Sequence, residues 1–287
     1  MRLGRDRHAI QSKSGRADFC LIFMHIPKTA GTTLVSTLQL NYPPQTTLHL
    51  NLLGRPIQEM ERFPPQTLSS LSLIHGHVPY GIHRYVQRPC GYITLLREPV
   101  ARVVSAYKHI LTRPHHELHD RVVGDRIGLE EFIDSFWVDK RISRQTRQLC
   151  DRHDAPLDSG AVAEAKRNLE GFLVVGLTER FEETFALLRR VLRLRLPLYV
   201  TRNVGRPVTV SERAVELIRE RERYDLELYH FARDLFADHV ARQGASFPVE
   251  VSAYRAMRPI ARLAGTGRTA ELLGKLSHAR AARNQAH

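Results

Sequence analysis

Four mainly apolar runs divide the chain, and each has the length of a strand. They cover residues 19–26 (FCLIFMHI), 71–75 (LSLIH), 91–96 (GYITLL) and 172–177 (FLVVGL). A short, mainly apolar run is typical of a strand that is buried on both faces, as the strands of a parallel sheet are. The runs therefore predict four buried strands.

Segments with apolar residues at helical spacing follow these runs. They cover residues 34–40, 100–111, 178–196 and 211–236. Pro99 suits the first turn of the second segment, because its missing N–H would have no intrahelical partner there. Ser211 is the expected N-cap of the last one. Strands that alternate with helices predict an α/β fold, with a central, mainly parallel sheet flanked by helices.

The other segments are more polar. Residues 45–70 hold three prolines and predict short helices and loops, whereas residues 114–168 are rich in His and Arg and predict a helical insertion. Residues 1–18 are basic and lack the apolar core of a signal peptide, so we expect a flexible tail. Residues 19–250 then form one main domain. Residues 251–287 form a basic helical tail, either packed or solvated, with a membrane-surface or partner-binding helix as the alternative.

The charge balance narrows the class of partner. Lys and Arg number 43 against 30 Asp and Glu, a formal net charge of +13. Such an excess suits an anion: a nucleotide, a nucleic acid, an acidic glycan or a membrane surface. Aromatic residues make up only 7% and do not alternate with basic clusters, which disfavours single-stranded nucleic acid. No stretch approaches the roughly 18 apolar residues of a transmembrane helix.

No metal site is predicted. Cys20, Cys90 and Cys150 form no CxxC pattern, and we expect reduced thiols, with one disulfide left open. His115, His116 and His119 lie beside Pro114 in a segment that is typical of a polar loop.

The first candidate site is the loop PKTAGTT, residues 27–33, where the first strand turns into a helix. A helix N-terminus offers unpaired N–H groups to an anion, and small residues let the anion approach the backbone. The order of residues is not that of a Walker A loop, because the lysine precedes the glycine. The loop therefore predicts a phosphate or phosphosulfate site built from Lys28, Thr29, Ala30, Gly31, Thr32 and Thr33.

A second candidate site follows the third strand. Arg97 lies at the end of that strand, and Ser105 lies two helical turns further on. Ligands of doubly wound sheets collect at the carboxyl ends of the strands, so Arg97 and Ser105 are expected to bind a second phosphate. Arg102 is left out, because it could equally be a surface charge.

Two long motifs carry a resemblance to a known family. FMHIPKTAGTTL and ITLLREPVARVVSAY resemble the two cofactor-binding signatures of sulfotransferases that use 3′-phosphoadenosine 5′-phosphosulfate (PAPS). They are most similar to the carbohydrate type that includes the heparan sulfate 2-O-sulfotransferases and their bacterial relatives. The resemblance spans residues 19–240 and includes QTRQL (145–149), GLTERFEETFALL (176–188) and YDLELYHFARDLF (224–236). It implies a P-loop-like sulfotransferase fold and transfer of a sulfuryl group to a hydroxyl of a carbohydrate-like acceptor.

The resemblance also implies roles for the two sites. The loop from Lys28 to Thr33 would hold the 5′-phosphosulfate, and Arg97 and Ser105 the 3′-phosphate. The region of Arg202 and Asn203 is expected to close over the nucleotide.

The segment His75-Gly76-His77 resembles the HGH element of the 2-O-sulfotransferases, whose histidines are catalytic. We expect His77 to be the general base, with His75 as an auxiliary base or substrate orienter. Lys28 would neutralise charge on the leaving phosphate, and His25 is interpreted as a packed histidine near the nucleotide.

Two other functions remain open from the sequence alone: a small-molecule kinase and a non-catalytic polyanion-binding protein. For a sulfotransferase we expect a carbohydrate or glycolipid acceptor, acidic in character, and no metal requirement. The expected location is the cytoplasm, as in a bacterial enzyme, with peripheral membrane contact through the basic tail as a further expectation.

Overall fold

The computed structural model describes residues 18–52, 55, 57–138, 141–150, 156–194 and 208–264. A five-stranded sheet with strand order β2-β3-β1-β4-β5 lies at its centre. The strands are β1 (Cys20–Met24), β2 (Thr47–Asn51), β3 (Leu73–His77), β4 (Cys90–Leu96) and β5 (Val174–Leu177). All four pairings are parallel. The predicted α/β fold with a mainly parallel sheet is confirmed.

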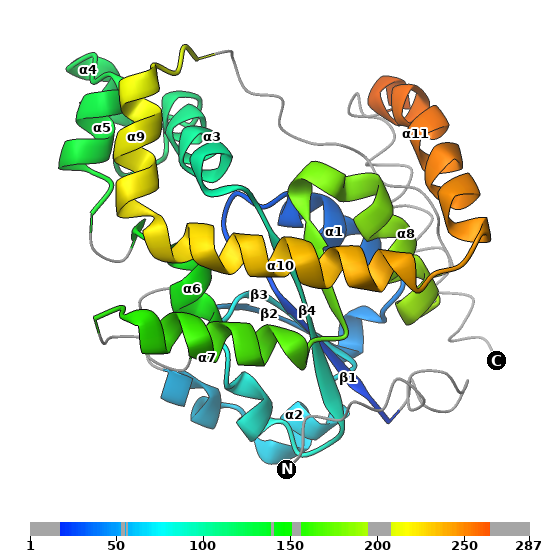
Figure 1. Ribbon diagram of the computed structural model, residues 1–287. Helices are drawn as coiled ribbons and strands as arrows, with labels where there is room; N and C mark the ends of the chain where they lie inside the picture. Colours follow the sequence, from blue (N-terminus) through cyan, green and yellow to red (C-terminus); the bar gives the residue numbers. More distant parts are fainter. Residues whose placement is uncertain are drawn as a thin grey trace.

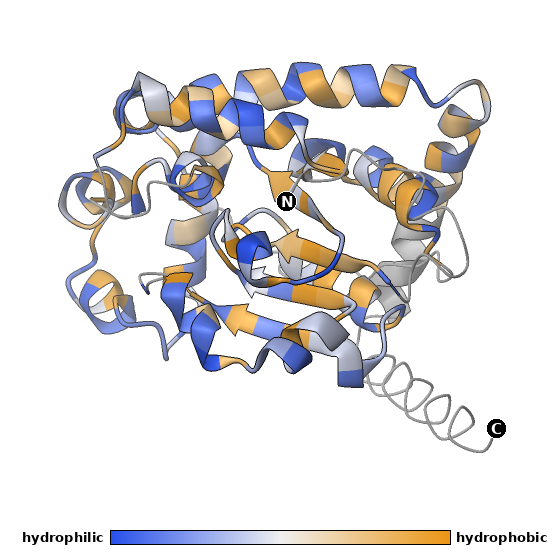
Figure 2. Ribbon diagram, turned by 90° about the horizontal axis from the view of Figure 1, so that it is seen from below, coloured by the Kyte–Doolittle hydropathy of each residue, from blue (hydrophilic) through white to orange (hydrophobic). Residues whose placement is uncertain are grey.

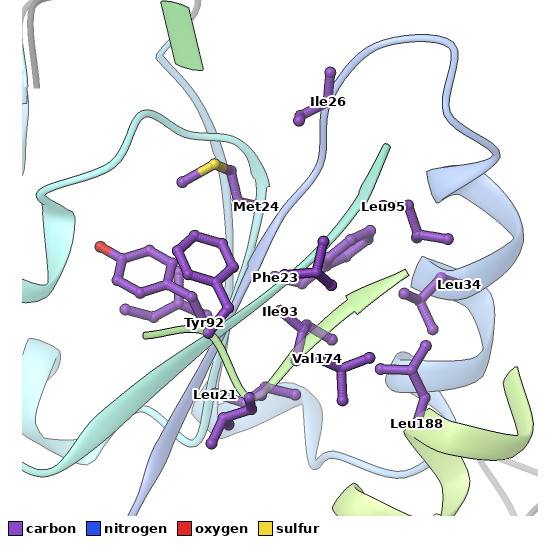
Figure 3. Close-up of a cluster of buried hydrophobic side chains, with 14 of the residues drawn as sticks. Leu21, Phe23, Met24, Ile26, Leu34, Tyr92, Ile93, Leu95, Val174 and Leu188 are labelled. Atoms are coloured by element: carbon purple, nitrogen blue, oxygen red, sulfur yellow. The ribbon is translucent and has the colours of Figure 1, made fainter. Parts of the chain in front are cut away.

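The burial of the central strand, β1, explains why its sequence is an uninterrupted apolar run. Every residue of β1 is buried, and the strand pairs with β3 on one side and β4 on the other. Figure 3 shows the packing on one face of the sheet, where Leu34 of a flanking helix meets Ile93, Leu95 and Val174 of the strands. A strand covered on both faces has no solvent-facing positions, and so its sequence is apolar throughout.

The helices alternate with the strands as predicted. Figure 1 labels most of them on the ribbon, and Figure 2 shows apolar strands beside helices of mixed polarity. The helices are α1 (Gly31–Gln39), α2 (Pro65–Ser70), α3 (Pro99–Leu111), α4 (His119–Gly124), α5 (Leu129–Ser135), α6 (Arg144–Leu149), α7 (Ser159–Glu170), α8 (Phe181–Leu192), α9 (Glu212–Arg221), α10 (Arg223–Ala241) and α11 (Ser246–Ala264).

The predicted helical insertion is confirmed, since α4, α5 and α6 lie within residues 114–168 and α7 begins there and ends at Glu170. It divides between two cores. The helices α4 and α5 gather with α3 and α9 at one end of the molecule (Figure 1), around Tyr107, Phe132, Trp137 and Ile218. The helices α6 and α7 instead pack with α10 beside the sheet. The insertion therefore reaches the carboxyl edge of the sheet through α6.

Two predicted elements were wrong. Residues 45–70 contain a strand, β2, besides the short helices; it lies at the sheet edge, and Leu50 is the one buried residue in its sequence TLHLN. Residues 211–236 form two helices, because the chain leaves helical geometry at the buried residue Glu222. The N-cap is confirmed: the Ser211 hydroxyl accepts from the amide of Ala214 at 3.0 Å.

The last described helix, α11, packs against α8. The rings of Tyr254 and Phe185 meet edge to face at 5.1 Å, and Glu250 forms ion pairs with Arg189 and Arg190 at 2.8 Å. The expected domain boundary at residue 250 therefore falls within a packed helix.

Other structural expectations can be compared directly. Cys20, Cys90 and Cys150 are reduced cysteines and not disulfides. Within the described part of the chain, no helix combines the length and the apolar character needed to cross a bilayer.

Candidate active site

The loop between β1 and α1 has an unusual backbone. Lys28 and Ala30 both adopt left-handed conformations, with φ values of 70° and 63°. Such conformations cost non-glycine residues about 1–3 kcal/mol and persist where the surroundings enforce them, often at ligand sites. Left-handed residues in a turn also make concave groups of backbone N–H that bind anions. No described side chain caps the N-terminus of α1, but the N–H of Thr33 donates to the carbonyl of Ala30 at 3.1 Å. The N–H groups that can serve an anion are therefore those that precede Thr33.

The threonines of this loop are not equivalent. Thr29 is fully buried, and its hydroxyl donates to the carbonyl of Ile26 at 2.8 Å. Its single hydroxyl hydrogen is therefore used inside the loop, which leaves its backbone N–H as the group that can serve an anion. Thr33 is largely buried, whereas Thr32 is exposed at the start of α1.

Gly31 is required by a histidine. A Cβ at position 31 would lie 2.0 Å from Cδ2 of His25, far inside van der Waals contact. The His25 ring also stacks on Phe23, with centroids 5.6 Å apart. The interpretation of His25 as a packed histidine beside the loop agrees with this geometry.

Lys28 and Arg97 meet at the carboxyl ends of β1 and β4. A terminal nitrogen of Arg97 donates to the main-chain carbonyl of Lys28 at 3.1 Å. Burial, with Arg97 and Arg113 nearby, lowers the pKa of Lys28 to about 8. No described carboxylate pairs with Lys28, and the nearest oxygen to Nε of Arg97 among described carboxylates is that of Glu179, at 4.0 Å. Two neighbouring cations with only one described carboxylate, at 4.0 Å, favour a bound anion.

Ser105 lies on α3, the helix that begins directly after Arg97. Pro99 occupies the first turn of α3 as predicted, and the Glu98 side chain caps it by accepting from the amide of Ala101 at 2.7 Å. Ser105 is half-buried, and its hydroxyl makes no hydrogen bond to any described residue. A donor that helix packing has not used is available to a phosphate near Arg97.

The His77 ring is fixed by a main-chain carbonyl. Its Nδ1 lies 2.8 Å from the carbonyl oxygen of His25. A carbonyl can only accept, so Nδ1 carries the hydrogen and Nε2 has the lone pair when the ring is neutral. Burial lowers the pKa of His77 below its usual value, with Arg144 and His49 acting in the same direction. His77 is therefore neutral near pH 7, with Nε2 able to accept a proton.

His75 has a different environment. It is 2% exposed, packs beside His49 with ring centroids 5.0 Å apart, and its Nδ1 has no hydrogen-bond partner in the described part of the chain. Burial, with His49 nearby, lowers its pKa to about 4. As the expected auxiliary base or substrate orienter, His75 therefore offers an acceptor far less surface than His77 does.

Two glutamines of α6 form hydrogen bonds with main-chain groups of the site. The sequence assigned neither of them a role. Gln145 forms two hydrogen bonds of 2.9 Å with the backbone N–H and C=O of Arg97. Gln148 donates to the carbonyls of His25 and Val78, at 3.1 and 2.9 Å. Both belong to the motif QTRQL, which was the available signal, but its spacing alone does not indicate their partners.

Arg102 is not the surface charge that the sequence suggested. It is 1% exposed and pairs with Glu222 at 2.9 Å and with Asp225 at 3.5 Å. Glu222 also accepts from the indole N–H of Trp137 at 2.6 Å. Asp225 accepts from the amide and hydroxyl of Thr146, so the same cluster anchors α6. Arg102 is thus part of the support beneath the site.

The structure brings most of the predicted site residues to one edge of the sheet. Lys28 follows β1, Arg97 follows β4 and His77 ends β3, and these three strands are adjacent. Hydrogen bonds from Arg97 to the Lys28 carbonyl and from His77 to the His25 carbonyl link them through the segment after β1. Arg202 and Asn203 lie outside the described residues. Among the residues that are described, no group of three or more His, Cys, Asp or Glu has the geometry of a metal site. The arrangement can bind a polyanion at its cationic side and remove a proton at His77.

A comparison with protein families gives one match over most of the chain. The model described as "Sulfotransferase family" matches residues 17–232. This range contains the β1–α1 loop, β3, β4, α3 and α6.

Curated relatives give weaker but consistent similarities. Human heparan-sulfate 6-O-sulfotransferase 3 is 29% identical over 177 residues, covering 50% of this chain and 37% of the relative. Mouse uronyl 2-sulfotransferase is 28% identical over 174 residues, covering 50% and 42%. Human heparan-sulfate 6-O-sulfotransferase 1 is 28% identical over 277 residues, covering 77% and 66%. The chain thus spans only part of the length of each of these relatives.

Among solved structures, mouse sulfotransferase SULT7A1 in complex with PAP aligns with a TM-score of 0.37 and 12% sequence identity. The alignment covers 76% of this chain and 70% of the mouse chain. So low a score carries no argument for this chain.

Proposed function

Because the chain belongs to the sulfotransferase family, we propose that it transfers a sulfuryl group from PAPS to a hydroxyl of an acidic carbohydrate. Its α/β fold with a helical insertion is the P-loop-like sulfotransferase fold. The observation that carries the proposal is the convergence of Lys28, Arg97 and a neutral His77 at one sheet edge.

The nucleotide's two phosphate-bearing ends fit the two cationic positions. The β1–α1 loop offers backbone N–H groups, the Lys28 ammonium and the Thr32 hydroxyl to the 5′-phosphosulfate. Arg97 and the Ser105 hydroxyl serve the 3′-phosphate; Nε of Arg97 is buried without a hydrogen-bond partner among described residues. A guanidinium binds phosphate through two parallel hydrogen bonds, which requires such uncommitted nitrogens.

The acceptor follows from the relatives rather than from the site. Relatives named as heparan-sulfate and uronyl sulfotransferases support an acidic carbohydrate. The net charge of +13 is compatible with such an acceptor. A glycolipid acceptor and a cytoplasmic location stay predictions.

His77 is the proposed general base. PAPS supplies the sulfuryl group. As a new bond forms between the acceptor oxygen and sulfur, the bond from sulfur to the bridging phosphate oxygen breaks, and Nε2 of His77 accepts the hydroxyl proton. The Lys28 ammonium stabilises the negative charge that develops on the leaving phosphate. His77 is preferred over His75 because His77 is half-buried, whereas His75 is 2% exposed.

The first test is binding of 3′-phosphoadenosine 5′-phosphate (PAP) by calorimetry, with ATP as competitor. Tight binding that depends on the 3′-phosphate supports the assignment. No binding of PAP, or a preference for ATP, overturns it and favours a kinase.

Turnover tests the acceptor and the base. Radiolabelled PAPS would be offered with heparan sulfate, its desulfated forms, a neutral polysaccharide and a glycolipid. The expected result is label transfer to acidic polysaccharide that His77→Ala slows by about 100- to 10,000-fold while its affinity for PAP stays at the wild-type level. A His77→Ala variant that retains full turnover would exclude His77 as the base.

A further inference from the structure

We propose that Gln148 is a positioning residue that fixes the hydrogen of His77 on Nδ1 and so leaves Nε2 as the basic nitrogen. The inference rests on the proposed function for its catalytic meaning, but the hydrogen position it predicts can be measured without turnover. It assigns a purpose to α6 that the resemblance to a family did not supply.

The argument begins at the carbonyl oxygen of His25, which has two donors. Nδ1 of His77 lies 2.8 Å from it and the side-chain amide nitrogen of Gln148 lies 3.1 Å from it. The amide of His25 in turn donates to the carbonyl of Gly76 at 2.9 Å, so His25 is tied to the strand that carries His77. The His25 carbonyl, which selects the tautomer of His77, is therefore itself held in place.

Gln148 also holds the backbone beside His77. Its amide nitrogen donates to the carbonyl of Val78, the next residue in the chain, at 2.9 Å. Both hydrogens of the amide are thus used: one on the His25 carbonyl that also binds Nδ1 of His77, and one on the carbonyl of Val78, the residue after His77. The Gln148 backbone carbonyl accepts from the amide of Tyr80 at 2.8 Å, which fixes α6 against the same segment.

The orientation of the Gln148 amide is dictated by these partners. Two carbonyl oxygens face its nitrogen, and the reversed orientation would place oxygen against oxygen. The consequence is that Oε1 of Gln148, which is 4% exposed as a residue, has no hydrogen-bond partner among the described residues. An unsatisfied buried acceptor costs stability. Gln148 bears this cost in the orientation that lets its amide nitrogen donate to both carbonyls beside His77.

The tautomer matters because the ring has no other described partner that would select it. The groups around it are the rings of His25 and His49 and the guanidinium of Arg144. His25 lies 4.6 Å away between centroids, and neither ring nor guanidinium fixes the hydrogen as a carbonyl does. A mobile His25 carbonyl would let the hydrogen move to Nε2 and remove the base from the acceptor side.

Gln145 provides a matched control on the same helix. It has the same side chain, is fully buried and also bonds to main-chain groups, but those of Arg97. Replacement of either glutamine by Met keeps the volume and removes the donors. Gln148→Met should act on the histidine, and Gln145→Met on nucleotide affinity.

The direct test is nitrogen-15 NMR of the histidine rings in the full chain, with His77 assigned by its loss in His77→Ala. We expect Nδ1 of wild-type His77 to be protonated, and a mixture of the two tautomers in Gln148→Met. Gln145→Met should retain the wild-type pattern. A wild-type His77 with its hydrogen on Nε2, or an unchanged pattern in Gln148→Met, overturns the proposal.

The kinetic test is a double-mutant cycle with PAPS and the best acceptor. Gln148→Met should lower kcat by about tenfold, the scale of one lost hydrogen bond, with KM and the PAP dissociation constant unchanged. In the His77→Ala background the same substitution should have no further effect. Additive losses would mean that Gln148 acts through the fold and not through His77. If the wild type shows no PAPS turnover, the proposed function fails, and the NMR result still decides the positioning role.

Discussion

Arg97 and Arg102 lie five residues apart and use their charge in opposite ways. The charge of Arg102 is buried between two carboxylates, those of Glu222 and Asp225, at 2.9 and 3.5 Å. Arg97 donates to a neutral carbonyl, and the closest described carboxylate to its Nε is 4.0 Å away. Both have a buried Nε without a described hydrogen-bond partner, so the carboxylates make the difference.

The contrast shows how a basic protein divides its cations between support and binding. A buried arginine with its counter-ions beside it stabilises the packing of α3 on α10. Arg97 lies beside Lys28 and has a described carboxylate only at 4.0 Å, that of Glu179, so on the proposed function it is the arginine that serves the nucleotide. The number of basic residues in the sequence does not separate these uses, but the distance to the nearest carboxylate does.

The largest expected effect is on folding. Arg102→Ala leaves Glu222 and Asp225 buried without their cation and should lower the free energy of unfolding by about 3–5 kcal/mol. Chemical denaturation measures this. Arg213→Ala is the control, because Arg213 forms an exposed ion pair with Glu216 at 3.7 Å and should change stability by less than about 1 kcal/mol. Equal losses in the two variants would contradict a supporting role for Arg102.

Arg97→Ala should weaken nucleotide binding and leave folding stability nearly unchanged, the converse of Arg102→Ala. We expect PAP affinity to fall by about 30- to 100-fold, or about 2–3 kcal/mol of charge-assisted hydrogen bonding, with little change in melting temperature. Calorimetry and thermal denaturation together give both values. Arg97→Lys keeps the charge but not the two parallel donors and should recover only part of the affinity. Wild-type affinity in Arg97→Ala would remove Arg97 from the nucleotide site.

The pH dependence of kcat/KM tests Lys28. Because its pKa is lowered to about 8, its ammonium is lost as the pH rises through 8, and kcat/KM should fall there. The pKa of His77 lies below its usual value, so the base stays deprotonated over the same range. In Lys28→Arg the alkaline fall should move up by at least about one pH unit, or about 1.4 kcal/mol. An alkaline limb that stays near pH 8 in this variant would assign the fall to another group.

The smallest effect should come from Ser105. Loss of one neutral donor to a phosphate costs about 1 kcal/mol, so Ser105→Ala should weaken PAP binding about fivefold. Thr112→Ala on the same helix is the control, since the Thr112 hydroxyl already donates to the carbonyl of Lys108 at 3.0 Å. If both substitutions alter binding equally, the change comes from α3 as a whole.

Local sequence predicted the parts of the fold whose burial is uniform. The strands β1 and β4 were recognised because they have apolar neighbours on both faces. The edge strand β2 was missed because solvent covers much of it and its residues do not form an apolar run. The break between α9 and α10 left no local signal either, since glutamate is a good helix former and the partner that makes Glu222 special is 120 residues away.

The candidate site divides in the same way. The anion loop and Arg97 were found because each directly follows a strand, and the histidine pair was found through its resemblance to the HGH element. The inward-facing hydroxyl of Thr29 and the roles of Gln145 and Gln148 were not, because each depends on a carbonyl whose position only the folded chain sets.

The long sequence separation of these contacts has a consequence for synthesis. Gln145 follows Arg97 by 48 residues, and Glu222 follows Arg102 by 120. At about 5–20 residues per second, the ribosome needs about 6 to 24 s to add the latter stretch. During that interval a nascent chain already carries the β1–α1 loop and Arg97 but lacks the carboxylates that pair with Arg102. On the proposed function, a chain stalled before residue 222 should therefore bind PAP more weakly than the released chain.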